Sequence, residues 1–377
     1  MRIAIDIRRI SEFGLGTYTR NAIRTLARLD HDNEYFLLGI PGKLSGIEDL
    51  PSNFTTIPTH PNEFSLASYL ELHRILKING CDLLHVPHLF WKPQAIPCPY
   101  VVTVHDLLDH MYRHSTSSDL KRTVHFVLTK QVLLKAARIL AVSHFSKKDT
   151  ESYFKVPGEK IEVIYNAIDE RFKLGHATAA DRVFIAQRYQ VNYPFLLYAG
   201  RISPHKNVVR IIEAFSLLKN QLLEEGRFTD LRLIIIGDEV SRHPDLRRTV
   251  IKSHMQNDVR FLGFVPIEVL RIFYDQAKIF VFPSLYEGFG LPPLEAMAHG
   301  TPVVTSNTSS IPEVVGNAAV MVNPENVFDI QRALYRVLLD QGLREKLKSR
   351  GIEQAQKFSW DESVSRMLRV YHEVAQS

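Results

Sequence analysis

Two series of continuous apolar runs, separated by helical patterns, constrain this chain more than any other feature. In the first half, the runs occupy residues 2–7, 34–39, 82–86, 100–104, 138–142 and 161–165. Segments with helical spacing separate several of them, at 16–29, 66–79 and 119–137. Strands that are apolar without alternation are buried on both faces, as in parallel sheets covered by helices. We therefore expect a parallel α/β domain.

A second series follows residues 166–193, which contain no clear strand and are predicted to form an interdomain linker. Its runs occupy 195–199, 231–236, 259–264, 279–283, 303–306 and 319–322. The α/β prediction is two Rossmann-like doubly wound domains, at 1–175 and 176–356, which suits a length of 377 residues. The last segment, 357–377, carries an amphipathic helical pattern over 357–374.

Composition excludes several classes of protein. Hydrophobic residues make up 45% of the chain and charged residues 23%, as in ordinary globular proteins, so disorder and coiled coil are poor interpretations. Cys81 and Cys98 are too few for a disulfide framework and are not at metal-ligand spacing. No run of about 18 uncharged apolar residues occurs. The N-terminus reaches a charge too early for a signal peptide, so we expect a cytoplasmic protein.

The net charge of +5 is spread along the chain. Residues 1–175 carry 22 Lys and Arg against 19 Asp and Glu, and the remainder carries 24 against 22. Neither half has the concentrated basic patch of nucleic-acid-binding domains, so no nucleic-acid partner is expected. The mild positive charge suits a phosphate-bearing small molecule or an anionic membrane surface.

The first candidate cluster follows the run 195–199 and reads Gly200-Arg201-Ile202-Ser203-Pro204-His205-Lys206-Asn207. Ligands of doubly wound sheets bind at the carboxyl ends of the strands, and two such domains favour a site in the cleft between them. Arg201 offers a planar fork for phosphate oxygens and Lys206 a compact charge, so both could hold one diphosphate. The alternative is two solvated cations in a loop.

The second candidate cluster follows the run 279–283 and reads Ser284-Leu285-Tyr286-Glu287-Gly288-Phe289-Gly290-Leu291-Pro292-Pro293-Leu294-Glu295. Gly288 and Gly290 let the backbone approach a ligand closely. Pro292 suits a first helical turn, where amide groups can face an anion. The carboxylates of Glu287 and Glu295 can accept hydrogen bonds from neighbouring hydroxyls of a sugar or a ribose. The alternative is a capped helix with one structural glutamate.

The N-terminal half adds two candidate functional sites and one sequence pattern of the kind that can bind a metal. His105 follows the run 100–104 and could act as a general base or a positioning group, although a lone histidine is more often structural. Gly14 and Gly16 form half of a dinucleotide fingerprint, with Thr19 in place of the third glycine, and such a helix start can hold a phosphate. Asp30-His31-Asp32 is interpreted as a solvated helix end, so no bound metal and no cofactor are expected.

These motifs together resemble family four retaining glycosyltransferases, which have the GT-B fold. The elements that occur in that family's order and rough spacing are Gly200-Arg201…Lys206-Asn207, Glu287-x7-Glu295, Val104-His105-Asp106 and the N-terminal glycine loop. Asn166-Ala167-Ile168-Asp169 resembles the family's Asn-Gly-Val/Ile-Asp element, with alanine replacing glycine. Asp6-Ile7-Arg8 and Gly14-Leu15-Gly16-Thr17-Tyr18-Thr19-Arg20 look most like the branch of bacterial polysaccharide mannosyltransferases. The resemblance covers nearly the whole chain.

The resemblance implies a GT-B architecture, in which the two domains face a central cleft and the C-terminal helix crosses back to the N-terminal domain. Arg201 and Lys206 would hold the diphosphate of a nucleotide-sugar. Glu287 would bind hydroxyls of the donor sugar and Glu295 those of the ribose, while His105 would lie beside the sugar. The other implied donor-binding positions are Gly14, Gly16, Gly200, Phe264, Gly288, Phe289, Gly290 and Leu291.

The implied reaction moves a hexose onto a hydroxyl of a glycan or lipid-linked glycan and retains the anomeric configuration. Mannose from GDP-mannose is the leading prediction, and fixed cations with helix-start amides would stabilise the leaving diphosphate without a metal. The alternatives are a UDP-sugar transferase, another sugar-nucleotide enzyme such as an epimerase, a sugar-nucleotide-binding scaffold and an NAD-dependent dehydrogenase. The missing third glycine and the paired-carboxylate loop count against the dehydrogenase.

Residues 121–130 combine cations with apolar residues, among them Lys121, Arg122 and Lys130. We interpret the segment as an ordinary amphipathic helix with a solvated face. The alternative is weak peripheral contact with an anionic surface at the inner face of the cytoplasmic membrane.

Overall fold

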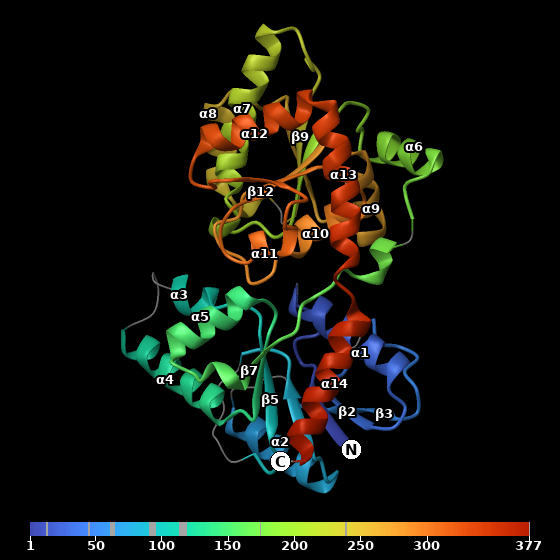
Figure 1. The fold of residues 1–377 in the computed structure, drawn as a ribbon, viewed down its shortest axis with the longest axis vertical. Helices are drawn as coiled ribbons and strands as arrows, with labels where there is room; N and C mark the ends of the chain where they lie inside the picture. Colours follow the sequence, from blue (N-terminus) through green and yellow to red (C-terminus); the bar gives the residue numbers. More distant parts are fainter. Residues whose placement is uncertain are drawn as a thin grey trace. The chain divides into compact units, whose positions relative to one another are not determined.

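The computed structural model describes residues 1–12, 14–43, 46–60, 65–89, 96–112, 119–173, 175–237 and 240–376. They form two compact units (Figure 1). Unit 1 comprises residues 1–167 with 359–377, and unit 2 comprises residues 168–358. The sequence-based division, at 175/176 and 356/357, differs slightly from this one.

Unit 1 contains a parallel sheet with the strand order β3-β2-β1-β4-β5-β6-β7. Its strands are β1 (Arg2–Asp6), β2 (Glu34–Gly39), β3 (Phe54–Pro58), β4 (Leu83–Val86), β5 (Tyr100–Val104), β6 (Arg138–Ala141) and β7 (Ile161–Val163). All were predicted except β3. Thr55 and Thr56 of this edge strand are exposed, so β3 lacks the continuous apolar run of a strand that is buried on both faces.

Helices with side-chain caps connect several of these strands. The helical segments of unit 1 before its C-terminal helix are α1 (Leu15–Leu29), α2 (Leu66–Ile78), α3 (Leu108–Tyr112), α4 (Asp119–Lys135), α5 (His144–Phe154) and η1 (Gly158–Lys160). The hydroxyl of Ser65 accepts a hydrogen bond from the Ser68 amide at the start of α2, and Ser143 caps α5 in the same way through the Ser146 amide.

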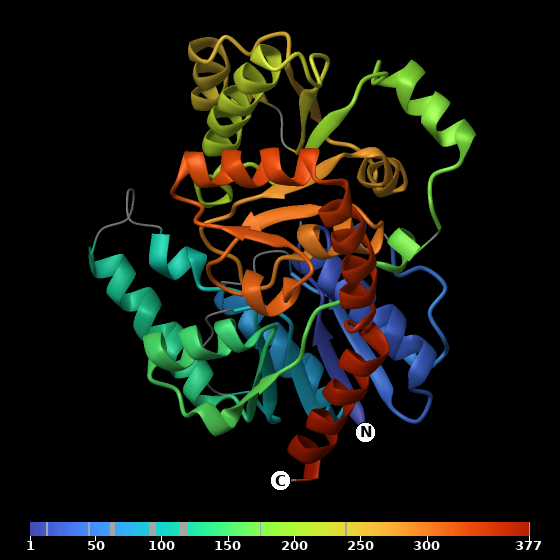
Figure 2. The same ribbon diagram turned by 45° about the horizontal axis from the view of Figure 1, so that its top comes forward.

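The end of the chain returns to unit 1 as α14 (Trp360–Gln376). The C-terminal helix was predicted to cross back to the N-terminal domain in this way. This helix packs against α1 and β4, and Figures 1 and 2 both show it, in red, beside the blue α1. The Trp360 ring lies edge-on to Tyr18 with centroids 5.6 Å apart. The Tyr371 hydroxyl lies 2.6 Å from Nδ1 of buried His85, whose Nε2 lies 2.8 Å from the Thr103 hydroxyl. A buried polar chain therefore fixes α14 to the sheet.

Unit 2 contains a second parallel sheet, with the order β10-β9-β8-β11-β12-β13. Its strands are β8 (Phe195–Ala199), β9 (Arg232–Ile236), β10 (Val259–Gly263), β11 (Ile279–Phe282), β12 (Val303–Ser306) and β13 (Val320–Val322). Each was predicted to within a residue at either end. The two doubly wound α/β domains expected from the sequence are therefore confirmed.

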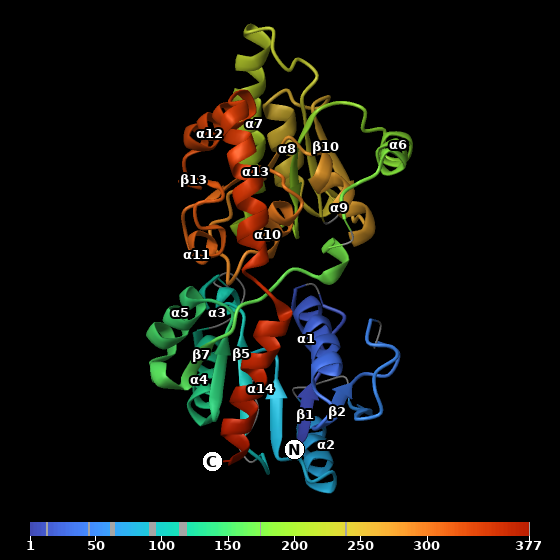
Figure 3. The same ribbon diagram turned by 45° about the vertical axis from the view of Figure 1, so that its right-hand side comes forward.

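The helices of unit 2 cover its sheet. They are η2 (Glu170–Lys173), α6 (Ala179–Arg188), η3 (Pro204–Lys206), α7 (Val208–Glu224), η4 (Val240–Arg242), α8 (Pro244–Lys252), α9 (Ile267–Gln276), α10 (Leu291–Ala298), α11 (Ile311–Val315), α12 (Val327–Leu339) and α13 (Gln341–Gln356). Helix α7 contacts α8 and α12, whereas α10 contacts α9 and α13 (Figure 3).

Much of the segment expected to be a linker is part of unit 2. Both η2 and α6 pack against α9. A capping box starts α6, because the Thr178 hydroxyl accepts from the Asp181 amide and the Asp181 carboxylate accepts from the Thr178 amide. The mixed charge of residues 166–193 concealed this short helix.

Candidate active site

Both candidate clusters of unit 2 lie at the point where the strand order of its sheet reverses. The reversal occurs between β8 and β11. Residues 200–207 follow β8, and residues 284–290 follow β11. Ligands of open α/β sheets bind outside the carboxyl ends of the strands at such a point.

Lys206 and Glu287 form an ion pair between these two loops. The Lys206 Nζ lies 2.5 Å from the Glu287 Oε1, and the two side chains are 16% and 10% exposed. The ammonium group also lies 5.4 Å from the centre of the Phe282 ring. Sequence reasoning placed both residues in the site but did not anticipate that they bond to each other.

Further hydrogen bonds fix the two loops to one another. The carbonyl oxygen of His205 accepts from the Leu285 amide at 2.7 Å and from the Ser284 hydroxyl at 3.0 Å. The amide group of Asn207 donates to the carbonyl oxygens of Pro283 and Pro324, at 3.0 and 2.6 Å. The lysine is therefore positioned by the protein before any ligand arrives.

Gly200 and Arg201 lie where β8 ends. Gly200 has a φ of 148°, and its carbonyl oxygen is so close to Gly237 that a Cβ on that residue would overlap it. Arg201 is exposed, and its carbonyl oxygen accepts from the Tyr198 hydroxyl at 3.0 Å. Its guanidinium makes no hydrogen bond or ion pair with the residues that the structure describes, so it can move towards an anion.

His205 lies between Arg201 and Lys206 in the sequence. Burial lowers the pKa of its imidazole to about 4, and the charges of Lys206 and Arg201 add to this effect. The imidazole is therefore neutral near pH 7. It contributes no third positive charge to the loop.

The loop before α10 is held by two serines that sequence reasoning missed. The Glu287 amide donates to the Ser309 hydroxyl at 3.1 Å. The Ser310 hydroxyl donates to the carbonyl oxygens of Glu287 and Phe289, at 2.9 and 2.8 Å. No motif signals these contacts, because they link positions more than twenty residues apart.

The start of α10 offers fewer amide donors than expected. Gly290 adopts a φ of 104°, and Leu291 begins the helix. Pro292 and Pro293 follow and carry no N–H, so they remove two of the donors that a helix start normally presents. Phe289 is buried against Phe358, with ring centroids 5.5 Å apart, so its side chain packs in the unit's interior. Gly288 lies in the same loop, between Glu287 and Phe289.

Glu295 lies on α10 and is oriented by a buried tyrosine. The Tyr274 hydroxyl donates to its Oε2 at 2.9 Å. Burial raises the pKa of Glu295 to about 7; the hydrogen bond from Tyr274 opposes this shift, and the charge of Asp169 adds to it. This carboxyl group is thus partly protonated near neutral pH and can both donate and accept hydrogen bonds.

Phe264 follows β10 at the edge of the same sheet. Its side chain is 70% exposed, which is unusual for a phenylalanine. The preceding Gly263 has a φ of 69°. Most of this side chain is therefore accessible to solvent.

In unit 1, His105 follows β5 and is fixed as a neutral ring. Its Nε2 lies 2.9 Å from the carbonyl oxygen of Pro87, and the ring lies edge-on to Tyr18. Burial lowers the pKa of His105 to about 4. Its backbone carbonyl accepts from the Ser146 hydroxyl at 3.0 Å. The Nε2–H therefore donates to Pro87, and a role as general base would fall to Nδ1 alone.

The two glycines at the start of α1, Gly14 and Gly16, lack a side chain for different structural reasons. Gly14 is the N-cap residue with a φ of 71°, and a Cβ there would meet open space. A Cβ on Gly16 would overlap the carbonyl oxygen of Ile10. The absence of a side chain at Gly16 thus follows from packing within unit 1 and needs no ligand.

Asp6 and Arg8 form a buried ion pair at the end of β1, to which the sequence reasoning gave no role. Their side chains are 2% and 5% exposed, and the Arg8 Nε lies 2.8 Å from the Asp6 Oδ1. The Arg8 Nη1 donates to the Ser68 hydroxyl at 2.9 Å. Burial alone would raise the pKa of Asp6, but Arg8 lowers it to about 2.

The Asp30-His31-Asp32 pattern lies at the end of α1, as predicted, but Asp30 is not solvated. Its side chain is buried and accepts hydrogen bonds from Asn33, the Tyr35 hydroxyl and the amides of Asp32 and Asn33. The prediction of a solvated helix end is wrong for this residue, whose carboxylate closes the turn into β2.

Helix α4 carries the segment considered for membrane contact. Lys121 and Arg122 are exposed, as are the apolar side chains of Leu120, Val124 and Val127. Among the described residues, no helix is both long and apolar enough to cross a bilayer.

Two family models together match most of the chain. The model for glycosyl transferases group 1 matches residues 182–354, and the model for glycosyltransferase family 4 matches residues 14–172. Sucrose-phosphate synthase from Thermosynechococcus elongatus has a similar structure, with a TM-score of 0.79 at 20% identity over 100% of both chains. Anabaena HepE in complex with UDP and glucose gives a TM-score of 0.77 at 17% identity over 99% of this chain and 100% of that one.

Several relatives are named as bacterial mannosyltransferases. O-antigen chain mannosyltransferase B of Escherichia coli is 35% identical over 63% of this chain and 60% of its own length. The serotype-specific mannosyltransferase WbdA of Escherichia coli is 29% identical over 75% of this chain but only 34% of its own length. O-antigen chain mannosyltransferase RfbU of Salmonella typhimurium is 31% identical over 71% of this chain and 68% of its own length. With both family models matched, these similarities show that the chain belongs to the family four glycosyltransferases and has their GT-B fold.

Proposed function

We propose that this protein is a retaining hexosyltransferase that moves mannose from GDP-mannose onto a glycan or lipid-linked glycan hydroxyl. The observation that carries the proposal is the Lys206–Glu287 pair at the strand reversal of unit 2. It joins a cation suited to a diphosphate with a carboxylate suited to sugar hydroxyls. The names of the O-antigen relatives support mannose as the donor sugar.

In the proposed reaction, the bond between the anomeric carbon and the diphosphate oxygen breaks, and a bond to the acceptor oxygen forms on the same face. The acceptor proton passes to the leaving phosphate oxygen. Lys206 and Arg201 would stabilise the negative charge that grows on the leaving group. Because Lys206 is already positioned by Glu287 and the loop contacts, little reorganisation would be needed during the reaction.

The remaining residues would bind the donor. Glu287 would accept hydrogen bonds from hydroxyls of the sugar, and Glu295, oriented by Tyr274, from the ribose. The exposed ring of Phe264 would stack on the base. His105 would contact the sugar through Nδ1, since Nε2 is bonded to Pro87.

The donor is tested by thermal stabilisation with a panel of nucleotides and nucleotide-sugars without metal, since a ligand that binds only the folded state raises the melting temperature. We expect a selective rise with GDP and GDP-mannose. A rise with UDP compounds instead would contradict mannose from GDP-mannose but keep the transferase. A folded sample that responds to none of them would favour a scaffold.

Retention and metal independence are tested in the transfer reaction itself. We expect an α-glycoside by NMR of the product's anomeric proton, and full transfer in EDTA. A β-product would refute retention. Transfer that is lost in EDTA and restored by Mn²⁺ would refute the metal-free mechanism.

Contact of α4 with an anionic membrane is an extension of this proposal for a lipid-linked acceptor. It rests on the exposed cations and apolar side chains of that helix. Pelleting with anionic liposomes should occur at low salt and decline at high salt. Failure to pellet at low salt would remove the idea.

A further inference from the structure

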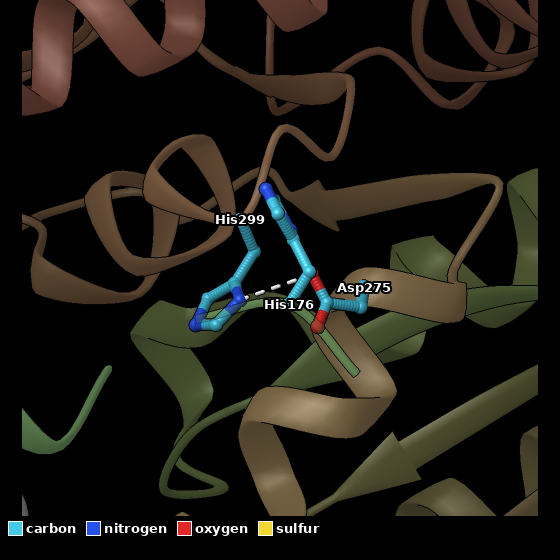
Figure 4. A group of neighbouring side chains, drawn as sticks. All are labelled: His176, Asp275 and His299. Carbon is cyan, nitrogen blue, oxygen red and sulfur yellow. Dashed lines mark hydrogen bonds and ion pairs between the residues drawn. The ribbon is translucent and has the colours of Figure 1, made fainter. Parts of the chain in front are cut away.

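Three side chains of metal-ligand type lie together in unit 2, at the C-terminal end of α10. His176 lies in the segment after η2, Asp275 lies on α9, and His299 directly follows α10 (Figure 4). The Asp275 Oδ1 is 2.9 Å from the His176 Nδ1 and 3.1 Å from the His299 Nδ1. One ligand atom from each of the three residues lies within 4.8 Å of the other two.

We propose that His176, Asp275 and His299 form a binding site for a divalent transition-metal cation such as Zn²⁺. Two imidazole nitrogens and one carboxylate oxygen are a donor set that zinc accepts, whereas Mg²⁺ and Ca²⁺ prefer oxygen ligands. Neighbouring ligands of a tetrahedral zinc with bonds of about 2.0 Å are about 3.3 Å apart, close to the two separations seen here.

Two of the three ligands are fixed by their surroundings. The side chains of Asp275 and His299 are 7% and 2% exposed. The second oxygen of Asp275 accepts from the Ala177 amide at 2.6 Å. The His299 ring is stacked on Tyr274 and lies edge-on to Phe172. His176 is 71% exposed, so a water molecule could complete the coordination.

The imidazole protons can leave the coordinating nitrogens without the loss of another hydrogen bond. Without a cation, each Nδ1 carries the proton that bonds the carboxylate; with a cation, that proton moves to Nε2. The Nε2 of exposed His176 can then donate to water. The Nε2 of His299 is buried and has no partner among the described residues, so a proton that moves there finds no acceptor, and binding at this residue costs more than at His176.

The charges around the cluster leave its carboxylate available. Arg271, one turn before Asp275 on α9, is directed to Asp181, with N and O 3.8 Å apart, and to the carbonyl oxygen of Gly175 at 3.2 Å. The Asp275 carboxylate can therefore neutralise part of the cation's charge.

The bound cation would have a stabilising role and would lie beside a donor residue, because the Tyr274 that orients Glu295 also stacks on His299. It would join the segment around His176 to α9 and to the end of α10. The proposed donor loop precedes α10 and His299 follows it, so the eight residues of that helix, about 12 Å, separate the two. The chemistry proposed for the donor site does not pass through this cation.

The test is a titration of the metal-stripped full chain with Zn²⁺, followed by calorimetry and by melting temperature without nucleotide. We expect one equivalent to bind and the melting temperature to rise. His176→Gln should keep the fold, because the side chain is exposed. It should weaken zinc binding at least about tenfold, because even removal of a residue that only hydrogen-bonds a metal ligand costs about that much affinity. His372→Gln, which changes an exposed histidine on α14, is the matched control and should bind as the wild type does.

Asp275→Asn is the second variant, because it keeps the size of the side chain and removes its charge. The proposal is overturned if the wild type binds no Zn²⁺, or if both His176→Gln and Asp275→Asn bind it with unchanged affinity. These measurements use no nucleotide-sugar. Failure to bind zinc would therefore leave the transferase proposal standing, and failure of transfer would leave the metal site standing.

Discussion

Each unit has an ion pair at the carboxyl end of its sheet, where the strand order reverses: beside β1 in unit 1, and beside β8 and β11 in unit 2. The two pairs are built in opposite ways. In unit 1, Asp6 and Arg8 are two positions apart at the end of β1 and almost completely buried. In unit 2, Lys206 and Glu287 are 81 positions apart, follow different strands and are 16% and 10% exposed. The Asp6–Arg8 pair joins residues that are close in the sequence, whereas the Lys206–Glu287 pair requires the loops after β8 and β11 to lie side by side.

This difference separates a structural role from a binding role. A charge that water cannot reach must keep its partner, so Asp6 and Arg8 should matter most to folding. A pair that water can reach can exchange partners with a ligand, so Lys206 and Glu287 should matter most to donor binding. The predictions below test this division, starting with the largest expected effect.

Arg8→Met should destabilise the protein by about 3–5 kcal/mol, because it leaves the buried carboxylate of Asp6 without its ion-pair partner. Urea denaturation measures the loss. Arg9→Met is the matched control: Arg9 is 3.9 Å from Glu12 at the surface, and such pairs are worth about 0–1 kcal/mol. Equal losses in the two variants would contradict a structural role for the buried pair.

Lys206→Met should reduce transfer about 10²–10³-fold, the usual effect of removing one fixed group that stabilises transition-state charge. It should destabilise the protein less than Arg8→Met does, because the Glu287 side chain that remains is 10% exposed, against 2% for Asp6. The measurements are kcat/KM with the donor found in the panel and urea denaturation. Lys278→Met is the control, since Lys278 is exposed at the other end of β11. If a folded Lys206→Met variant keeps wild-type transfer, the binding role is refuted.

The sequence predicted the strands of unit 2 and the loops after them because each buried strand is an unbroken apolar run. Lys206, Glu287 and Glu295 could be placed from those runs, since the end of a strand fixes where the next residues lie. The Lys206–Glu287 bond could not be predicted, because it depends on the order of strands in the sheet, which no local pattern encodes.

Contacts that hold the site were also beyond prediction. Ser309, Ser310 and Tyr274 act through hydrogen bonds to residues far along the chain, and their own neighbours carry no periodic signal. In contrast, the edge strand β3 was missed because two adjacent exposed threonines, Thr55 and Thr56, interrupt the apolar run. Sequence patterns report burial well and pairwise contacts poorly.

Glu295 should make stability depend on pH. Its folded pKa of about 7 lies above the ordinary value of 4.5, so between these values the folded protein holds a proton that the unfolded chain releases. The free energy of unfolding should therefore be greater near pH 5 and fall as the pH rises to 7. At roughly 1.4 kcal/mol per unit of pKa the fall is about 2–3 kcal/mol, and partial exposure of the side chain reduces this figure. Urea denaturation of the wild type and Glu295→Gln from pH 5 to 8 measures the difference. A difference between the two that does not change with pH would contradict the raised pKa.

Gly16→Ala should destabilise unit 1 by about 1–3 kcal/mol, the usual cost of forcing an extra carbon into a packed site. The new Cβ would overlap the backbone carbonyl of Ile10, which cannot move as a side chain can. Gly342→Ala is the matched control, because Gly342 is also the second residue of its helix but has room for a Cβ, and alanine there should be neutral or stabilising by up to about 1 kcal/mol.

Gly16→Ala also decides between the packing role and the donor contact that the family resemblance implies for Gly16. Packing predicts lost stability with nucleotide affinity unchanged at temperatures where the variant is folded. If the variant instead keeps its stability and loses nucleotide affinity, Gly16 serves the ligand, and the division between a structural edge in unit 1 and a binding edge in unit 2 fails at this position.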